Sequence, residues 1–149
     1  MPLPPRIVIP ARAPELGKTR LAATLDAGQR VALGLRLFDH VLDLAIAAVG
    51  PEAVHVISRS GALLNRAEAR GAHIISETAK GLNPALEQAA AQLGRAGSGP
   101  ILSLSVDLPL LGADDLAALL AAPGDVVCAT DALREGTNAL LQRSPGLTP

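Results

Sequence analysis

The sequence predicts an α/β domain whose central, mostly parallel sheet is covered by helices on both faces. Two observations lead to this prediction. Short apolar runs rich in β-branched residues alternate along the chain with longer segments in which apolar residues recur every three or four positions. Glycine, proline and polar residues separate the two kinds of segment. Strands that alternate with helices are typical of parallel sheets, because a crossover helix must return the chain to the same edge.

The first strand and the first helix have the clearest patterns. Residues 6–10, Arg-Ile-Val-Ile-Pro, predict a buried strand that ends at its proline. Asp26, with Gln29 three positions later, resembles a capping box, and the apolar residues beyond it return at intervals of four and three. We therefore expect a long amphipathic helix that continues to Val49 and ends near Gly50.

The rest of the chain continues the alternation. Strands are expected at residues 53–58, 73–76, 101–106 and 126–129, helices at 63–70 and 113–121, and a sixth strand from 139–141. Asn83 is the expected N-cap of a further helix, with Pro84 in its first position. No internal repeat or low-complexity linker interrupts this pattern. We therefore expect one domain, residues 1–149.

The composition excludes several classes of protein. Of the 149 residues, 49% are hydrophobic and 18% are charged, which is typical of a folded domain and not of a disordered chain. Thirteen Lys plus Arg against fourteen Asp plus Glu give a net charge of −1, and Phe38 is the only aromatic residue. A nucleic-acid-binding surface is therefore not expected, because it needs a basic field or stacking side chains.

The sequence also carries no sign of secretion or of a membrane span. Cys128 is the only cysteine and cannot form an internal disulfide; its place in a predicted strand suggests a core residue. The first residues lack the charged and apolar regions of a signal peptide, and no apolar run approaches the ~18 residues that a membrane span needs. We expect a soluble, cytoplasmic protein. The oligomeric state stays open, with a homodimer among the alternatives.

In open sheets of this kind, ligands bind outside the carboxyl ends of the strands. This rule selects the loops at residues 10–20, 77–83, 107–112 and 131–138. The first of them carries three cations, Arg12, Lys18 and Arg20, directly after a buried strand. Cations and backbone N–H groups in such a place suit a phosphate chain, although a solvated loop would have the same composition.

A P-loop is the obvious alternative for this first loop, because Gly17-Lys18-Thr19 matches the end of that motif. The first glycine of the motif would have to stand at position 12, which is Arg12. The expected helix cap at Asp26 also lies too far along the chain for a helix that opens at Lys18. The sequence therefore argues against a P-loop fold.

Asp107 follows the fourth predicted strand and precedes Leu108-Pro109. A carboxylate there is well placed for Mg²⁺, which takes one or two protein carboxylates together with substrate phosphates. The alternative is an aspartate that accepts turn N–H groups before a proline. Turn chemistry and capping likewise explain Thr137-Asn138 and Asn83 as well as ligand binding does. The three histidines, at positions 40, 55 and 73, are interpreted as structural.

Taken together, four short motifs resemble the 2-phospho-L-lactate guanylyltransferase family of deazaflavin coenzyme F-420 biosynthesis. In chain order they are Ile9-Pro10 with Lys18-Thr19-Arg20-Leu21, Gly81-Leu82-Asn83 with Ala85-Leu86, Asp107-Leu108-Pro109-Leu110-Leu111, and Asp131 followed by Gly136-Thr137-Asn138-Ala139-Leu140-Leu141. The resemblance implies a three-layer, Rossmann-like nucleotidyltransferase domain. It also implies that GTP and a phosphorylated three-carbon acid, namely 2-phospho-L-lactate, phosphoenolpyruvate or 3-phospho-D-glycerate, are joined with release of pyrophosphate.

The resemblance further implies roles for individual residues. Lys18, Arg20 and Asp107 would be catalytic, with Asp107 as the ligand of Mg²⁺. Nucleotide binding would involve Pro10, Arg12, Lys18, Gly81, Leu82 and Asn83, and acceptor binding would involve Thr137 and Asn138. Arg12 stands where the family usually has a lysine, which keeps the charge and changes its geometry.

The sequence departs from the family at its end. Members usually continue beyond the sixth strand with a Phe-Gly-Pro-like segment and a late acidic motif, whereas this sequence ends at Pro149. We therefore expect a domain that is shorter than its family, with Asp131 as the nearby acid that could replace the missing carboxylate. Two alternatives stay open: a molybdopterin-type or other nucleotidyltransferase, although the Leu-Ala-Gly-Gly opening of that group is missing, and a nucleotide-binding domain without catalysis.

Overall fold

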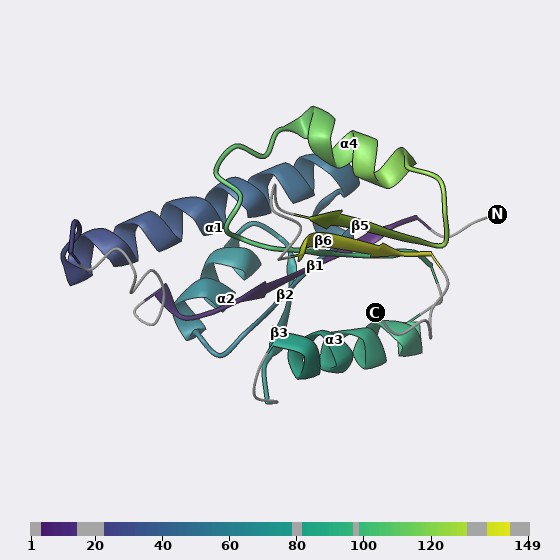
Figure 1. The fold of residues 1–149 in the computed structure, drawn as a ribbon. Helices are drawn as coiled ribbons and strands as arrows, with labels where there is room; N and C mark the ends of the chain where they lie inside the picture. The colour runs from purple at the N-terminus through teal and green to yellow at the C-terminus, as the bar shows by residue number, and fades with distance from the viewer. Residues whose placement is uncertain (1–3, 15–22, 79–81, 97–98, 131–136, 144–149) are drawn as a thin grey trace.

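Six strands form the central sheet of the computed structural model, which describes residues 4–14, 23–78, 82–96, 99–130 and 137–143 (Figure 1). The strands are β1 (Arg6–Ala11), β2 (Val54–Ser58), β3 (His73–Ser76), β4 (Ile101–Leu104), β5 (Val126–Thr130) and β6 (Thr137–Gln142). Their order is β3-β2-β1-β4-β6-β5. Because β6 is antiparallel to both β4 and β5, it alone runs against the other five strands. The prediction of a mostly parallel sheet is confirmed.

In the part of the chain that the structure describes, four α-helices pack against the two faces of this sheet. They are α1 (Ala27–Val49), α2 (Gly61–Ala69), α3 (Leu82–Ala96) and α4 (Ala113–Ala121), and a short 3-10 helix, η3 (Pro51–Ala53), precedes β2. Figure 1 shows α1, α2 and α4 on one side of the sheet and α3 on the other. The fold therefore has three layers, as expected for strands that alternate with helices.

The long helix α1 begins where the sequence places its cap. The Asp26 carboxylate accepts the N–H of Gln29 at 2.7 Å, and the Gln29 side chain accepts the N–H of Asp26 at 2.9 Å. This reciprocal pair is the predicted capping box. The helix ends at Gly50, whose φ of +87° is a conformation that L side chains rarely adopt. Both predicted ends of α1 are confirmed.

The larger apolar core lies between the sheet and the three helices on its first face. Phe38, the one aromatic side chain, is 1% exposed in this core. Aliphatic residues of β1, β2, β4 and β6 meet residues of α1, α2 and α4 there: Ile7, Ile9, Val54, Val56, Leu102, Leu104, Leu141, Val41, Leu42, Leu63 and Leu116. Burial of these side chains provides most of the stabilisation expected for a domain of this size.

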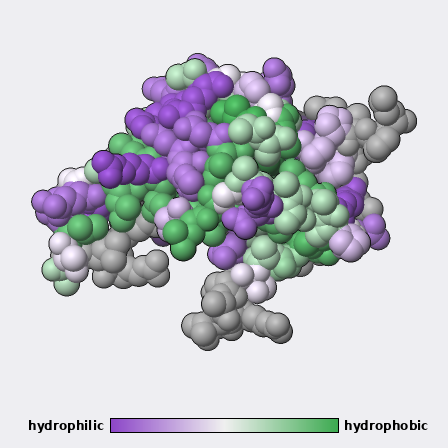
Figure 2. Space-filling model, turned by 90° about the horizontal axis from the view of Figure 1, so that it is seen from above, coloured by the Kyte–Doolittle hydropathy of each residue, from purple (hydrophilic) through white to green (hydrophobic). Residues whose placement is uncertain are grey.

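On the same side of the molecule, ion pairs join α1 to α2. The Arg70 guanidinium lies 3.3 Å from the Asp39 carboxylate and 2.8 Å from that of Asp43, and Arg66 also pairs with Asp39. Seen from above, this face of the molecule has a hydrophilic area next to a hydrophobic one (Figure 2). No helix of the described residues has both the length and the apolar composition of a membrane span.

The second face of the sheet differs from the expectation of full coverage. The apolar cluster beneath α3 contains residues of β1, β2, β3 and β4, among them Val8, Ile57 and Leu93. It contains no described residue of β5 or β6. Cys128 is exposed and Val126 is 46% exposed. The prediction of Cys128 as a core residue is therefore wrong, because β5 is the outermost strand and α3 does not reach its second face.

Two predicted boundaries are also wrong. Pro10 does not end the first strand but lies inside β1, where it pairs with Ile57 of β2. Its missing N–H is tolerated there because the pairing of β1 with β4 already ends at Val8. Asn83 is not an N-cap, because α3 begins at Leu82. Pro84 then falls in the first turn of the helix, where the N–H groups have no partner within the helix.

Candidate functional site

The ends of five parallel strands and the start of β6 lie along one edge of the sheet. Arg12 follows β1, and Asp107 follows β4 by three residues. Because β6 is antiparallel to β4, with Leu104 opposite Ala139, its first residues Thr137 and Asn138 lie at this same edge. The topology therefore brings together Arg12, Asp107 and Thr137 from three of the four predicted loops, as the sequence-based rule requires.

Ser105 connects the end of β4 to the start of β6. Its backbone N–H donates to the carbonyl oxygen of Asn138 at 2.9 Å, and its hydroxyl accepts the N–H of Asp107 at 3.2 Å. Asp107 is exposed. Ser105 therefore contacts both the candidate metal ligand and a candidate acceptor-binding residue, and the sequence analysis did not identify it.

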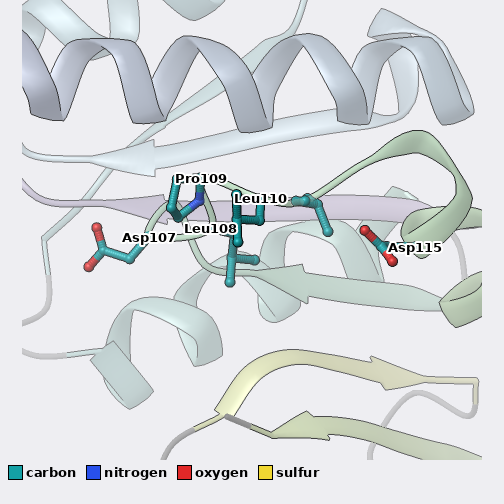
Figure 3. Close-up of a pocket in the computed structure, with 6 residues that line it drawn as sticks. Asp107, Leu108, Pro109, Leu110 and Asp115 are labelled. Carbon is teal, nitrogen blue, oxygen red and sulfur yellow. The ribbon is translucent and has the colours of Figure 1, made fainter. Parts of the chain in front are cut away.

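An open hollow of about 290 Å³ lies along the loop between β4 and α4. Its lining residues are Asp107, Leu108, Pro109, Leu110, Leu111 and Asp115 (Figure 3). Asp107 and Asp115 lie at opposite ends of this loop in Figure 3, with the apolar side chains between them. Leu110 is 93% exposed. The Asp115 carboxylate accepts the N–H of Gly112 at 2.8 Å, so it is part of the start of α4.

The end of β1 is held by a buried hydroxyl. Ser58, which is fully buried at the end of β2, donates to the carbonyl oxygen of Ala11 at 2.6 Å and accepts the N–H of Ser60 at 3.0 Å. Pro14 then lies against α1, since a Cβ atom on Gly34 would be 3.4 Å from the Pro14 Cβ. Arg12 is exposed between these two fixed points.

A glutamine of α3 organises the chain beyond β3. The Gln88 side chain donates to the carbonyl oxygen of Ser76 at 2.9 Å and accepts the N–H of Thr78 at 3.0 Å. The N–H of Glu77 donates to the carbonyl oxygen of Ser58 at 2.9 Å. These bonds fix the first residues of the predicted loop at 77–83, and the sequence analysis identified none of them.

Several of the predicted site residues lie beyond what the structure describes. Lys18, Arg20 and Gly81 are outside the described residues, as is Asp131. Leu82 and Asn83 form the first turn of α3, but their side chains are not among those described. The roles of these residues stay predictions.

The described residues are compatible with one magnesium ion that shares its coordination with a substrate. They contain no group of three or more His, Cys, Asp or Glu side chains that could enclose a metal. Mg²⁺ does not need such a cage, because it keeps several waters and is commonly held by one or two carboxylates and by phosphate oxygens. Asp107, exposed at the rim of an open hollow, fits this mode of binding.

The three histidines have structural contacts. Two of them lie near the amino ends of strands, and the third contacts the loop after β4. His55 and His73 are paired near the amino ends of β2 and β3, with ring centroids 4.9 Å apart and nearly parallel planes. Burial, helped by the nearby charges of His73 and Arg6, lowers the pKa of His55 to about 4. The His40 ring contacts the loop after β4 at the carbonyl oxygen of Leu111. These contacts are compatible with the interpretation of all three histidines as structural residues.

A mostly parallel α/β sheet with charged loops at its carboxyl edge is the arrangement of nucleotide-binding α/β proteins. Solved structures share this fold at low sequence identity. A cytidylyltransferase from Leptospira borgpetersenii has a TM-score of 0.59 and 17% identity, with 95% of this chain and 60% of that one covered. A protein of Desulfovibrio desulfuricans G20, described as a nucleotide-diphospho-sugar transferase, has a TM-score of 0.68 and 14% identity, with 97% and 65% covered.

Comparison with protein families is more specific. The model of the family described as "Guanylyl transferase CofC like" matches residues 5–148, so the chain belongs to this family of nucleotidyltransferases. Several relatives are named phosphoenolpyruvate guanylyltransferase. That of Rubrobacter xylanophilus is 39% identical, with 95% of this chain and 70% of the relative covered; that of Chloroflexus aggregans is 37% identical, with 96% and 74% covered. The resemblance predicted from the four motifs is confirmed.

Proposed function

We propose that this chain transfers the guanylyl group of GTP to the phosphate of a phosphorylated three-carbon acid, as a step of coenzyme F-420 biosynthesis. Membership of the CofC-like family carries the proposal. Phosphoenolpyruvate is the preferred acceptor, because the similar proteins bear that name. The same chemistry allows 2-phospho-L-lactate and 3-phospho-D-glycerate, which the experiment below compares.

The reaction needs no nucleophile from the protein. A phosphate oxygen of the acceptor forms a bond to the α-phosphorus of GTP, and the bond from that phosphorus to the oxygen bridging to the β-phosphorus breaks. Pyrophosphate leaves with the electron pair of the broken bond. Catalysis then depends on positioning and on neutralising the charge of the phosphates.

The described residues fit these two tasks. Arg12, exposed after β1, provides a planar cation for the triphosphate, and Thr137 and Asn138 provide polar groups for the acceptor at the start of β6. Asp107 would hold Mg²⁺, and the ion when bound supplies charge neutralisation on the departing pyrophosphate. Pro10 places the chain that leads to Arg12, and Lys18, Arg20, Gly81, Leu82 and Asn83 complete the proposed nucleotide site.

Release of pyrophosphate tests the proposal. The whole chain, with Mg²⁺, is given GTP, ATP or CTP together with each of the three acids. We expect pyrophosphate release with GTP as the nucleotide, and we expect phosphoenolpyruvate to be the acid that gives the most release.

The reaction consumes metabolites of the cytoplasm, which is the compartment we propose. Size-exclusion chromatography of the same preparation distinguishes a monomer from the homodimer that the sequence leaves open.

Asp107→Asn provides the matched variant for the metal. It should lower activity by about a hundredfold or more, since removal of one group that stabilises developing charge has effects of that size. Asp114→Asn removes an equal charge from an exposed position in the first turn of α4 and should leave activity unchanged. Equal activity of the wild type and Asp107→Asn would contradict the assigned role, and release with CTP in place of GTP would contradict the proposed base.

A further inference from the structure

A histidine on α1 contacts the loop that carries Asp107. The Nε2 atom of His40 lies 2.9 Å from the carbonyl oxygen of Leu111, 71 residues further along the chain. A carbonyl oxygen can only accept, so Nε2 must carry the proton of this bond. The bond is partly buried, and it joins a helix packed on the sheet to the apolar end of the loop.

Two further hydrogen bonds of this loop are local. The N–H of Leu111 donates to the carbonyl oxygen of Leu108 at 3.2 Å, which closes the turn, and Asp115 accepts the N–H of Gly112 at 2.8 Å. These two bonds shape the loop, and the bond from Ser105 to Asn138 joins its start to β6. The bond from His40 joins the other end of the loop to α1, which packs on β1 and β2 through the larger core.

The same helix also supports the loop that carries Arg12, through the contact of Pro14 with Gly34. Gly34 and His40 are six residues apart on α1, which corresponds to about 9 Å along a helix axis. Helix α1 therefore provides one rigid element against which both charged loops rest. A change at His40 would free one of these loops while it leaves the other in place.

From these contacts we infer that His40 is a positioning residue for the transfer reaction. It acts through the Leu111 carbonyl group and places the loop so that Asp107 faces the phosphates. The catalytic part of this inference rests on the proposed function. The hydrogen bond between His40 and Leu111 is observed independently of that function. Both the neutral ring with a proton on Nε2 and the doubly protonated ring can donate this bond, so the role needs no change of charge.

Two substitutions at this position separate the hydrogen bond from the bulk of the ring. His40→Leu removes the donor, and His40→Gln keeps an N–H donor on a side chain of similar reach. Val49→Ala, at the carboxyl end of α1 and partly buried against the same core, is the control for a general loss of stability. Each variant is purified as the whole chain, and its Tm is measured.

Three measurements report on the loop. Amide hydrogen exchange at residues 108–112 reports its order, Mn²⁺ titration followed by electron paramagnetic resonance reports on Asp107, and kinetics report kcat and KM for GTP. We expect faster exchange in His40→Leu, and about tenfold weaker binding of Mn²⁺ with a matching loss of kcat/KM, because small displacements of positioning groups have effects of this size. His40→Gln should recover most of each loss, with an unchanged pH profile, and Val49→Ala should show none of them.

The outcomes distinguish failure of this inference from failure of the proposed function. Normal exchange at 108–112 in His40→Leu overturns the positioning role, whatever the activity. Equal losses in His40→Leu and in Val49→Ala overturn it as well, because they would show an effect of stability alone. A wild type that makes no guanylyl product overturns the proposed function, while exchange at the loop still tests the bond to Leu111.

Discussion

The hydroxyl of Ser58 donates to the carbonyl oxygen of Ala11, with 2.6 Å between the two oxygen atoms. This bond links the last residue of β2 to the last residue of β1, directly before Arg12. Ser58 is fully buried, so both groups would lack water if the bond were removed. The pair therefore contributes to stability and also fixes the start of a loop at the candidate site.

Substitution Ser58→Ala should lower the free energy of unfolding by about 1–3 kcal/mol, the usual cost of an unsatisfied buried polar group. Urea denaturation measures this loss. Ser76→Ala is the matched control, because Ser76 pairs with Ser58 in the sheet but is exposed. If both variants lost the same amount of stability, the buried bond would not be the cause.

Arg12 is exposed, and its replacement should change binding more than folding. In Arg12→Ala we expect the KM for GTP to rise by about tenfold to a hundredfold, since a charge-assisted hydrogen bond contributes about 1.5–3 kcal/mol. Its Tm should stay within a degree or two of the wild type, because surface substitutions away from special features have small effects. Arg36→Ala, which removes another exposed cation, should leave both quantities unchanged. A normal KM in Arg12→Ala would exclude the proposed phosphate contact.

His55 should make the protein less stable in mild acid. Burial beside His73 and Arg6 lowers its pKa in the folded chain to about 4, whereas the unfolded residue titrates near its ordinary value of 6.5. Between these values the unfolded chain binds more protons, so the free energy of unfolding falls as the pH falls from about 6.5 to about 4. The ring is only half-buried, so we expect a loss of about 1–2 kcal/mol, less than the full shift would give.

Thermal unfolding at several pH values between 4 and 7.5 measures this loss. His55→Val removes the titrating ring, whose buried Nε2 atom has no hydrogen-bond partner among the described residues, so the variant should have the flatter profile in that range. If the wild type and His55→Val lost stability in parallel, other groups would account for the acid sensitivity.

Gln88 should control the order of the chain beyond β3. In Gln88→Leu the bonds to Ser76 and Thr78 are lost, and we expect faster amide exchange at Thr78. The cost in stability should be about 0.5–1.5 kcal/mol, because these groups are exposed and water can replace the glutamine. Glu87→Leu, at the exposed neighbouring position on α3, should leave exchange at Thr78 unchanged. Unchanged exchange in Gln88→Leu would show that other contacts hold this segment.

Much of the fold could be predicted because its signals are local. The exchange of hydrogen bonds between Asp26 and Gln29 involves residues three apart, so the start of α1 is visible in the sequence. Strand β3 and helix α4 have the predicted bounds, 73–76 and 113–121, because apolar periodicity records which side of an element is buried. The rule on carboxyl ends then located the loops of Arg12, Asp107 and Thr137 on one edge without any distance being known.

The errors and omissions share a physical cause, which is dependence on neighbours distant in sequence. Pro10 is tolerated inside β1, and Cys128 is exposed, because of where β1 and β5 lie in the strand order, and no local pattern encodes that order. The bond of Ser105 to Asn138 and that of His40 to Leu111 likewise join residues that only the packed fold brings together. The sequence by itself determined the elements, the family and the types of group at the site. The tertiary structure decided which of these groups meet, because contact between distant residues depends on strand order and helix packing.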